Sequence, residues 1–151
     1  MTPLLGAAVG PHRLEELVAS DALGVVHRAH DQASGRPLLI RLLLPLANDP
    51  EAARRFRIEL AAIARLDHPS IVPVEEWGEA EGVPYVVTAD PGAHRLSEAL
   101  AGGRRLDPRL ALRVLRGLAA ALDHAHRAGV VHGAVEPSRV LLGRDGSVQL
   151  G

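Results

Sequence analysis

The chain has 151 residues with 47% hydrophobic side chains, which is enough for one folded domain with a sizeable core and excludes general disorder. A formal net charge of −1 and only 2% aromatic residues exclude an electrostatic or stacking surface for nucleic acid. Cysteine is absent, which excludes disulfides, thiolate catalysis and cysteine zinc sites.

The N-terminal residues 1–10 lack the basic and apolar regions of a signal peptide. The longest apolar run, Leu38 to Leu46, is interrupted by Arg41 and Pro45 and is too short to cross a membrane. We therefore expect a cytoplasmic protein with no membrane span in this chain and no nucleic-acid partner.

Short apolar segments separated by glycine and proline fill the first part of the chain and predict strands. Turns are expected near residues 20–22 and 34–37. Asp49 as N-cap and Pro50 at the first helical position predict a helix that ends before His68-Pro69. The expected strands cover residues 12–19, 24–30, 38–44, 71–77 and 83–88.

Helices dominate the second part of the chain. A short helix near residues 96–101 precedes a long helix over residues 108–128, which Gly129 ends, and residues 140–142 and 147–150 predict a short hairpin. The polar side chains of the long helix form one narrow stripe, and most of its surface is apolar, so it needs neighbours. We expect self-association or a protein partner that covers Leu112, Leu115, Leu118 and Leu122.

Several motifs are set in this order of elements. Residues 55–60 read Arg-Phe-Arg-Ile-Glu-Leu, residues 65–72 read Arg-Leu-Asp-His-Pro-Ser-Ile-Val, and residues 125–132 read Ala-His-Arg-Ala-Gly-Val-Val-His. They resemble helix C, the H-P-N-I-V turn and the approach to the catalytic loop of bacterial serine/threonine protein kinases. The resemblance implies an α+β, protein kinase-like fold with a complete N-lobe (an antiparallel five-stranded sheet plus helix C) and a partial helical C-lobe.

The resemblance also implies domain bounds and a nucleotide pocket. An N-terminal tail (1–11) would precede the N-lobe (12–88), a linker (89–95) and the partial C-lobe (96–151). The glycine-rich loop is matched by Ala19, Asp21, Gly24 and Val26, the lysine strand by Leu39 and Arg41, and the hinge by Thr88, Ala89 and Asp90, while Leu141 matches a residue that packs on adenine. Glu59 matches the helix C glutamate, and we expect it to pair with Arg41.

The matched positions depart from the family's chemistry. All 17 basic residues are arginine, so Arg41 stands where the family has lysine. Ala134 stands in place of the catalytic-loop aspartate, Glu136 in place of a lysine and Arg139 in place of a metal-binding asparagine. The chain ends before the D-F-G position. These departures predict no catalytic or metal-binding residue, and weak or absent binding of ATP and magnesium, the family's cofactors.

Four functions remain open on the sequence. A catalytically inactive, pseudokinase-like domain with a binding, scaffolding or regulatory role in signalling explains a retained core with lost motifs; on this prediction the chain is not an enzyme. A fragment of a serine/threonine protein kinase explains the end before D-F-G. A relative of the small-molecule kinases is the third possibility, because the pair His132-Gly133 is typical of them. A truncated, non-functional reading frame is the fourth.

Overall fold

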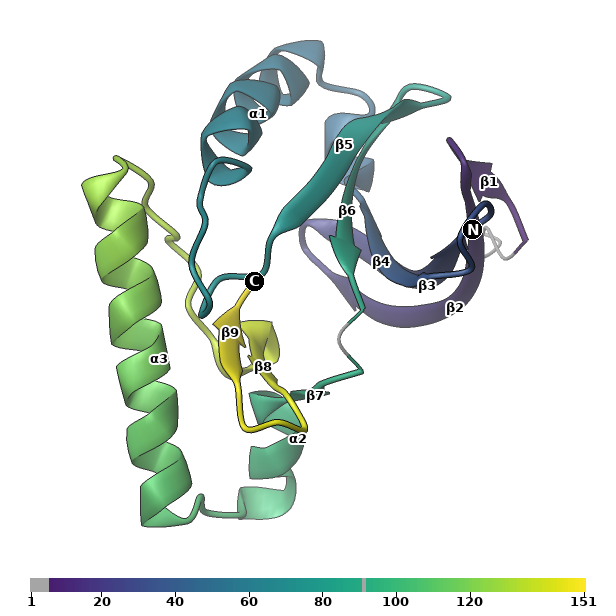
Figure 1. The fold of residues 1–151 in the computed structure, drawn as a ribbon. Coiled ribbons are helices and arrows are strands. Elements are labelled where there is room, and N and C mark those ends of the chain that lie inside the picture. Colours follow the sequence, from purple (N-terminus) through teal and green to yellow (C-terminus); the bar gives the residue numbers. More distant parts are fainter. Residues whose placement is uncertain (1–5, 91) are drawn as a thin grey trace. The chain divides into compact units, whose positions relative to one another are not determined.

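A computed structural model describes residues 6–90 and 92–151, which form two compact units (Figure 1). The first unit holds the described residues up to Ala61 together with residues 74–90. The second unit holds residues 62–73 and the described residues from Gly92 to the end of the chain. Each unit has its own buried cluster, so each is described by itself.

An antiparallel sheet forms the first unit, and it confirms the five predicted strands. In spatial order the strands are β1 (Ala8–Val9), β2 (His12–Asp21), β3 (Gly24–Asp31), β4 (Pro37–Leu42), β6 (Val83–Ala89) and β5 (Val74–Ala80). The prediction of five strands missed β1, which lies inside the predicted tail. Its two residues pair with β2 across a turn at Gly10, and two residues are too short for an alternating pattern.

Two predicted strand ends are also corrected. Residues 71–73 precede β5, and Ile71 instead forms an isolated parallel bridge with Leu150 inside the second unit. Strand β4 ends at Leu42, because the chain turns into a short 3-10 helix, η1 (Leu44–Leu46), around Pro45. Proline fixes φ and lacks an N–H donor, so it cannot continue the ladder of hydrogen bonds.

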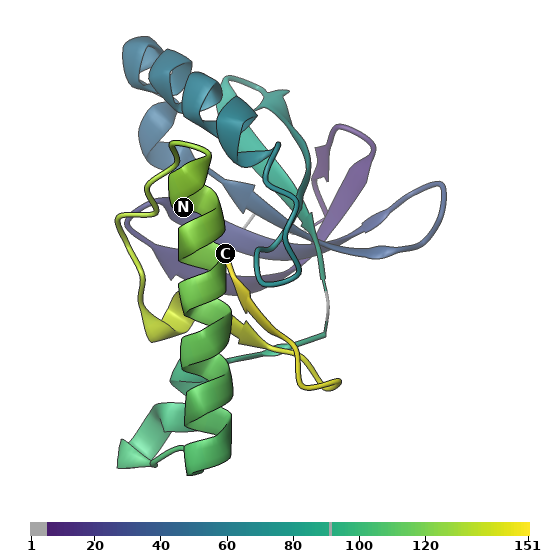
Figure 2. The ribbon, with the colours of Figure 1, turned by 60° about the vertical axis from the view of Figure 1, so that its left-hand side comes forward.

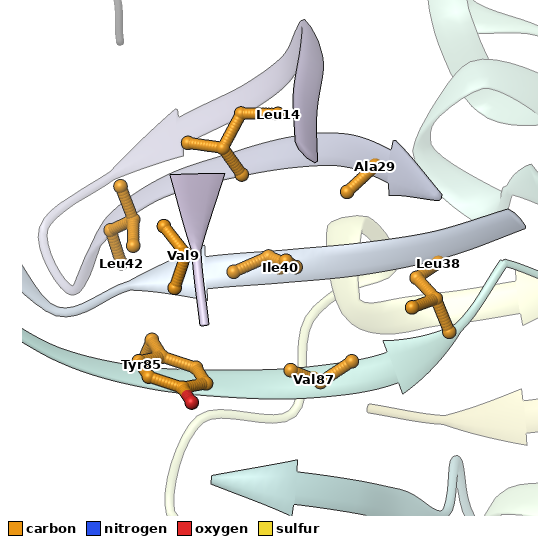
Figure 3. Close-up of a cluster of buried hydrophobic side chains, with 8 residues drawn as sticks. All are labelled: Val9, Leu14, Ala29, Leu38, Ile40, Leu42, Tyr85 and Val87. Carbon is orange, nitrogen blue, oxygen red and sulfur yellow. The ribbon is translucent and has the colours of Figure 1, made fainter. Parts of the chain in front are cut away.

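The core of the first unit lies on one face of this curved sheet (Figure 3). Strand β4 alternates along its length, and Leu38, Ile40 and Leu42 are each at most 2% exposed. They pack with apolar side chains from the neighbouring strands, among them Leu14 and Val87. The predicted strand over residues 38–44 is therefore buried through every second residue of β4.

Helix α1 (Pro50–Ile63) begins where the sequence predicts. The Asp49 carboxylate accepts a hydrogen bond from the Ala52 N–H at 2.9 Å, which is an N-cap contact. Leu60 and Phe56 face a second cluster around Leu43 and Val86. This packing places α1 against Leu43, which follows β4, and against Val86 of β6.

A polar network joins β2 to β5 at the edge of the core. The Tyr85 hydroxyl donates to one oxygen of Glu76 at 2.7 Å, and His12 Nε2 lies 2.9 Å from the other. His12 is only 4% exposed. A Cβ on Gly78 would stand 2.9 Å from the Tyr85 hydroxyl oxygen, so glycine there makes room for the ring.

Burial and the hydrogen bond to Glu76 raise the pKa of Tyr85 to about 12. The protonated phenol therefore contributes stability below pH about 10, which is lost as the pH rises through about 12. Because Tyr85 is the single tyrosine, tyrosinate absorbance after a rapid pH jump reports on it alone. We expect a midpoint near 12 in the folded chain and a lower one in Glu76→Gln. A folded chain that titrates at the value of an exposed tyrosine contradicts the network.

The second unit pairs helices with a small sheet. Its elements are β7 (His94–Arg95), α2 (Leu96–Leu100), η2 (Ala101–Gly103), α3 (Pro108–Arg127), η3 (Pro137–Arg139), β8 (Val140–Leu142) and β9 (Val148–Leu150), with the strands in the order β7-β8-β9. Helix α3 runs along β9 (Figure 2). A Cβ on Gly117 would lie 3.0 Å from Val148 Cβ, so this glycine permits the close approach.

The long helix is partly covered within its own unit, which corrects one expectation. Leu118 and Leu122 pack against the core cluster of the second unit, whereas Leu112 and Leu115 are 49% and 64% exposed. Binding of a protein partner or of a second copy to this helix stays a prediction. It now concerns only the exposed Leu112 and Leu115. In the part of the chain that the structure describes, no helix has the length and apolar character to cross a membrane.

Candidate functional site

The register of the sheet brings most predicted pocket residues of the first unit onto one face. Directly opposed residues of antiparallel strands project to the same side. Val26 opposes both Ala19 and Arg41, and Leu39 opposes Thr88. The residues on this face, opposite the apolar core, are Ala19, Asp21, Gly24, Val26, Leu39, Arg41 and Thr88. Ala89 opposes Leu38 and therefore belongs to the other face.

Arg41 is held by Asp21, which corrects the expected pair with Glu59. The Arg41 Nη1 atom lies 2.9 Å from both carboxylate oxygens of Asp21, and the two side chains are 22% and 34% exposed. Glu59 is exposed on α1, and within the described residues no ion pair joins it to Arg41. The helix turns Leu60 toward the sheet, so the adjacent Glu59 points elsewhere.

Gly24 is required by packing between strands. It has φ +134°, and a Cβ there would lie 1.9 Å from the carbonyl oxygen of Leu42. The hairpin of β2 and β3 closes beside it, where the Asp21 carboxylate accepts from the Leu23 N–H at 2.8 Å. The glycine that survives from the family's loop pattern thus lets β3 approach the end of β4.

A second ion pair on this face was missed by sequence reasoning. The Arg28 Nε atom donates to Asp90 at 2.8 Å, and its Nη1 donates to Glu16 at 2.6 Å. Arg28 opposes Leu39 in the sheet, so it lies in the same row as Thr88. Arg28 and Asp90 are 62 residues apart, and only the strand register reveals the contact.

In the second unit, the segment that matches the catalytic loop is organised by His132. Its Nδ1 accepts from the Ala134 N–H at 3.2 Å, so its Nε2 carries the proton and donates to the Gly151 carbonyl at 3.3 Å. These contacts give His132 a structural role in this segment. Ala134 is exposed and offers no group for acid–base chemistry.

The charged residues of this segment contact one another. The Glu136 carboxylate accepts from the Ser138 hydroxyl at 2.5 Å and lies 3.7 Å from Arg139 Nε. Leu141 is half-buried in β8 and opposes Gln149. Across residues 6–90 and 92–151, no three histidine, aspartate or glutamate side chains are placed to hold a metal ion.

Comparisons with known proteins agree with the fold. No family model matches the chain. It is 36% identical over 146 residues to a probable serine/threonine-protein kinase of Streptomyces coelicolor, covering 93% of this chain and 22% of that protein. It is 35% identical over 157 residues to the serine/threonine-protein kinase PknA of Mycobacterium tuberculosis, covering 99% and 36%.

A solved structure matches the whole described fold. The kinase domain of Mycobacterium tuberculosis PknI superimposes with a TM-score of 0.87 at 25% identity, covering 99% of this chain and 62% of that one. The chain spans only 22% and 36% of the length of the two kinases named above. The kinase fold and the α+β class predicted from the sequence are confirmed.

These relatives correct one prediction. The expectation that the chain is not an enzyme is contradicted, because its relatives are named serine/threonine-protein kinases. That expectation relied on single positions such as Arg41, Ala134 and Arg139, and it gave little weight to similarity along the rest of the chain. Along nearly its whole length the chain is therefore similar to bacterial serine/threonine protein kinases, and it has the fold of the N-lobe and the first part of the C-lobe of a kinase domain.

Proposed function

We propose that this chain is the nucleotide-binding part of a serine/threonine protein kinase, an ATP-dependent phosphotransferase. The observation that carries the proposal is the sheet face of the first unit, where Arg41 lies beside Val26 and opposite the apolar core. The names of the relatives support the same reaction. Because the chain spans only part of their length, transfer by the whole protein is part of the proposal.

Arg41 is the phosphate-binding group in this proposal. A guanidinium presents a planar set of donors that matches phosphate oxygens, and it stays charged at any physiological pH. Here its partner is the Asp21 carboxylate, so an incoming phosphate must replace that carboxylate. Asp21 therefore orients Arg41 and also competes with the ligand. Val26 and Leu39 give the same face apolar side chains for the base of a nucleotide.

The residues of this chain do not fit magnesium. Ala134 and Arg139 occupy the matched positions and offer no oxygen ligand, and the Glu136 carboxylate already contacts Ser138 and Arg139. Glu136 is the carboxylate nearest to Ala134 along this loop, and we assign it the positioning of the substrate hydroxyl.

The test begins with nucleotide binding by calorimetry on the full 151-residue chain. We expect weak binding of ATP by the wild type, because Asp21 competes for Arg41. Asp21→Asn should bind ATP about three- to five-fold more tightly, in line with the value of a partly exposed ion pair. Arg41→Ala should lose binding. Glu59→Gln is the matched control, since it removes the same charge from the exposed side of α1 and should change nothing.

Transfer is measured separately, with radiolabelled ATP and a generic serine peptide. The proposal expects label in the peptide, lost in Arg41→Ala and reduced in Glu136→Gln. Absence of ATP binding at millimolar concentration overturns the proposal. Binding without transfer overturns its phosphotransferase part and leaves a binding or regulatory module.

A further inference from the structure

The second unit contains a groove that takes no part in the proposed phosphotransfer. It has a volume of about 610 Å³ and lies between β7, the α2–η2 segment, the first half of α3 and the turn that joins β8 to β9. This volume is within the range of ligand sites, which is about 300–1,000 Å³. Apolar side chains of Ala99, Leu110 and Leu142 contribute to its lining.

Three arginines line the groove and come from three different elements. Arg104, after η2, donates from Nε and Nη2 to the carbonyl oxygens of Ala101 and Glu98, at 3.0 and 2.7 Å. Arg113 lies on α3, and its Nη1 would be 2.9 Å from a Cβ on Gly146, so the guanidinium rests on the β8–β9 turn. Arg144 is exposed on that same turn.

The carboxylates near the groove do not neutralise the positive charge of its arginines. Glu98 is the one acidic residue among the described residues of the lining, and its carboxylate lies 3.4 Å from His94 Nδ1. Asp145 is directed into its own turn, where it accepts from the Ser147 N–H at 2.9 Å. Within the ranges that the structure describes, neither Arg113 nor Arg144 forms an ion pair. The groove therefore combines an apolar lining with two guanidinium groups that no carboxylate neutralises.

We infer that this groove is a docking site for an acidic peptide segment of a partner protein, with an apolar side chain between aspartates or glutamates. The apolar side chain fits against Leu110 and Leu142, and the carboxylates on either side meet Arg113 and Arg144. A peptide is favoured over a small anion because the cations come from separate elements and the lining between them is partly apolar. Among the described residues that line the groove none is aromatic, which disfavours stacking of nucleic-acid bases.

The inference is tested by fluorescence anisotropy with the full chain and no nucleotide, so its outcome is independent of the proposed phosphotransfer. The probe is a labelled peptide with a central leucine between two pairs of glutamates. Arg144→Glu and Arg113→Glu should each weaken binding about five-fold, as expected for exposed charge pairs with added repulsion. Arg116→Glu changes the same charge on α3 outside the groove and should bind like the wild type.

Three outcomes overturn the inference. The first is no binding of the peptide at millimolar concentration by a wild-type chain whose circular dichroism shows it folded. The second is an equal loss in Arg116→Glu, which reveals non-specific charge attraction. The third is equal or tighter binding of inorganic phosphate or a short single-stranded RNA, which assigns the groove to another ligand. Arg144 lies on an exposed turn, so its variant tests the site even if Arg113→Glu unfolds.

Discussion

Replacement of Gly24 by alanine is expected to destabilise the first unit by about 3 kcal/mol, since backbone strain alone costs roughly 1–3 kcal/mol and a steric clash adds to it. The added Cβ would lie 1.9 Å from the Leu42 carbonyl oxygen, and both partners belong to the backbone. Neither atom can move without separating β3 from the end of β4. A φ of +134° is in addition unfavourable for any residue with a side chain.

Urea titration followed by Trp77 fluorescence measures this effect, because Trp77 is the single tryptophan and lies on β5 in the first unit. Gly35→Ala is the matched control. It has φ +70° with no atom within 4 Å of the added Cβ, so we expect a cost of only about 1 kcal/mol. Similar midpoints for the two variants would contradict the close approach of Gly24 to Leu42.

Replacement of Ile40 by alanine is expected to cost about 2–5 kcal/mol, the range for a large side chain removed from a packed core. Ile40 is 0% exposed, at the centre of the cluster shown in Figure 3. The cavity that remains is lined by strands joined by hydrogen bonds on both sides of β4, so the site has little freedom to collapse.

The same urea titration supplies the measurement, and Ile58→Ala supplies the control. Ile58 lies on α1 and is 61% exposed, so its truncation should change stability by less than about 0.5 kcal/mol. A cost at position 40 no greater than that at position 58 would show that the face carrying Ile40 is not the core of this unit.

Some residues of the nucleotide site could be predicted from short motifs, and others depend on contacts between distant parts of the chain. Gly24, Val26 and Arg41 were found because each belongs to a short motif, and the register then placed them on one face. The predicted partner of Arg41 was wrong. Asp21 and Glu59 are both carboxylates far from Arg41 in the sequence, and no local pattern indicates which of them it contacts. The contact of Arg28 with Asp90 gave no sequence signal at all.

The sequence by itself determined most of the helices and strands and the resemblance to protein kinases. The apolar run of β4, the N-cap at Asp49, and motifs in and after α1 depend on residues a few positions apart, so they can be read along the chain. Tertiary structure decided which distant groups meet: Asp21 with Arg41, His12 with Glu76, and three arginines around one groove. The physical reason is that strand register and helix rotation result from packing, which is non-directional and collective, whereas caps and turns are set by local hydrogen bonds.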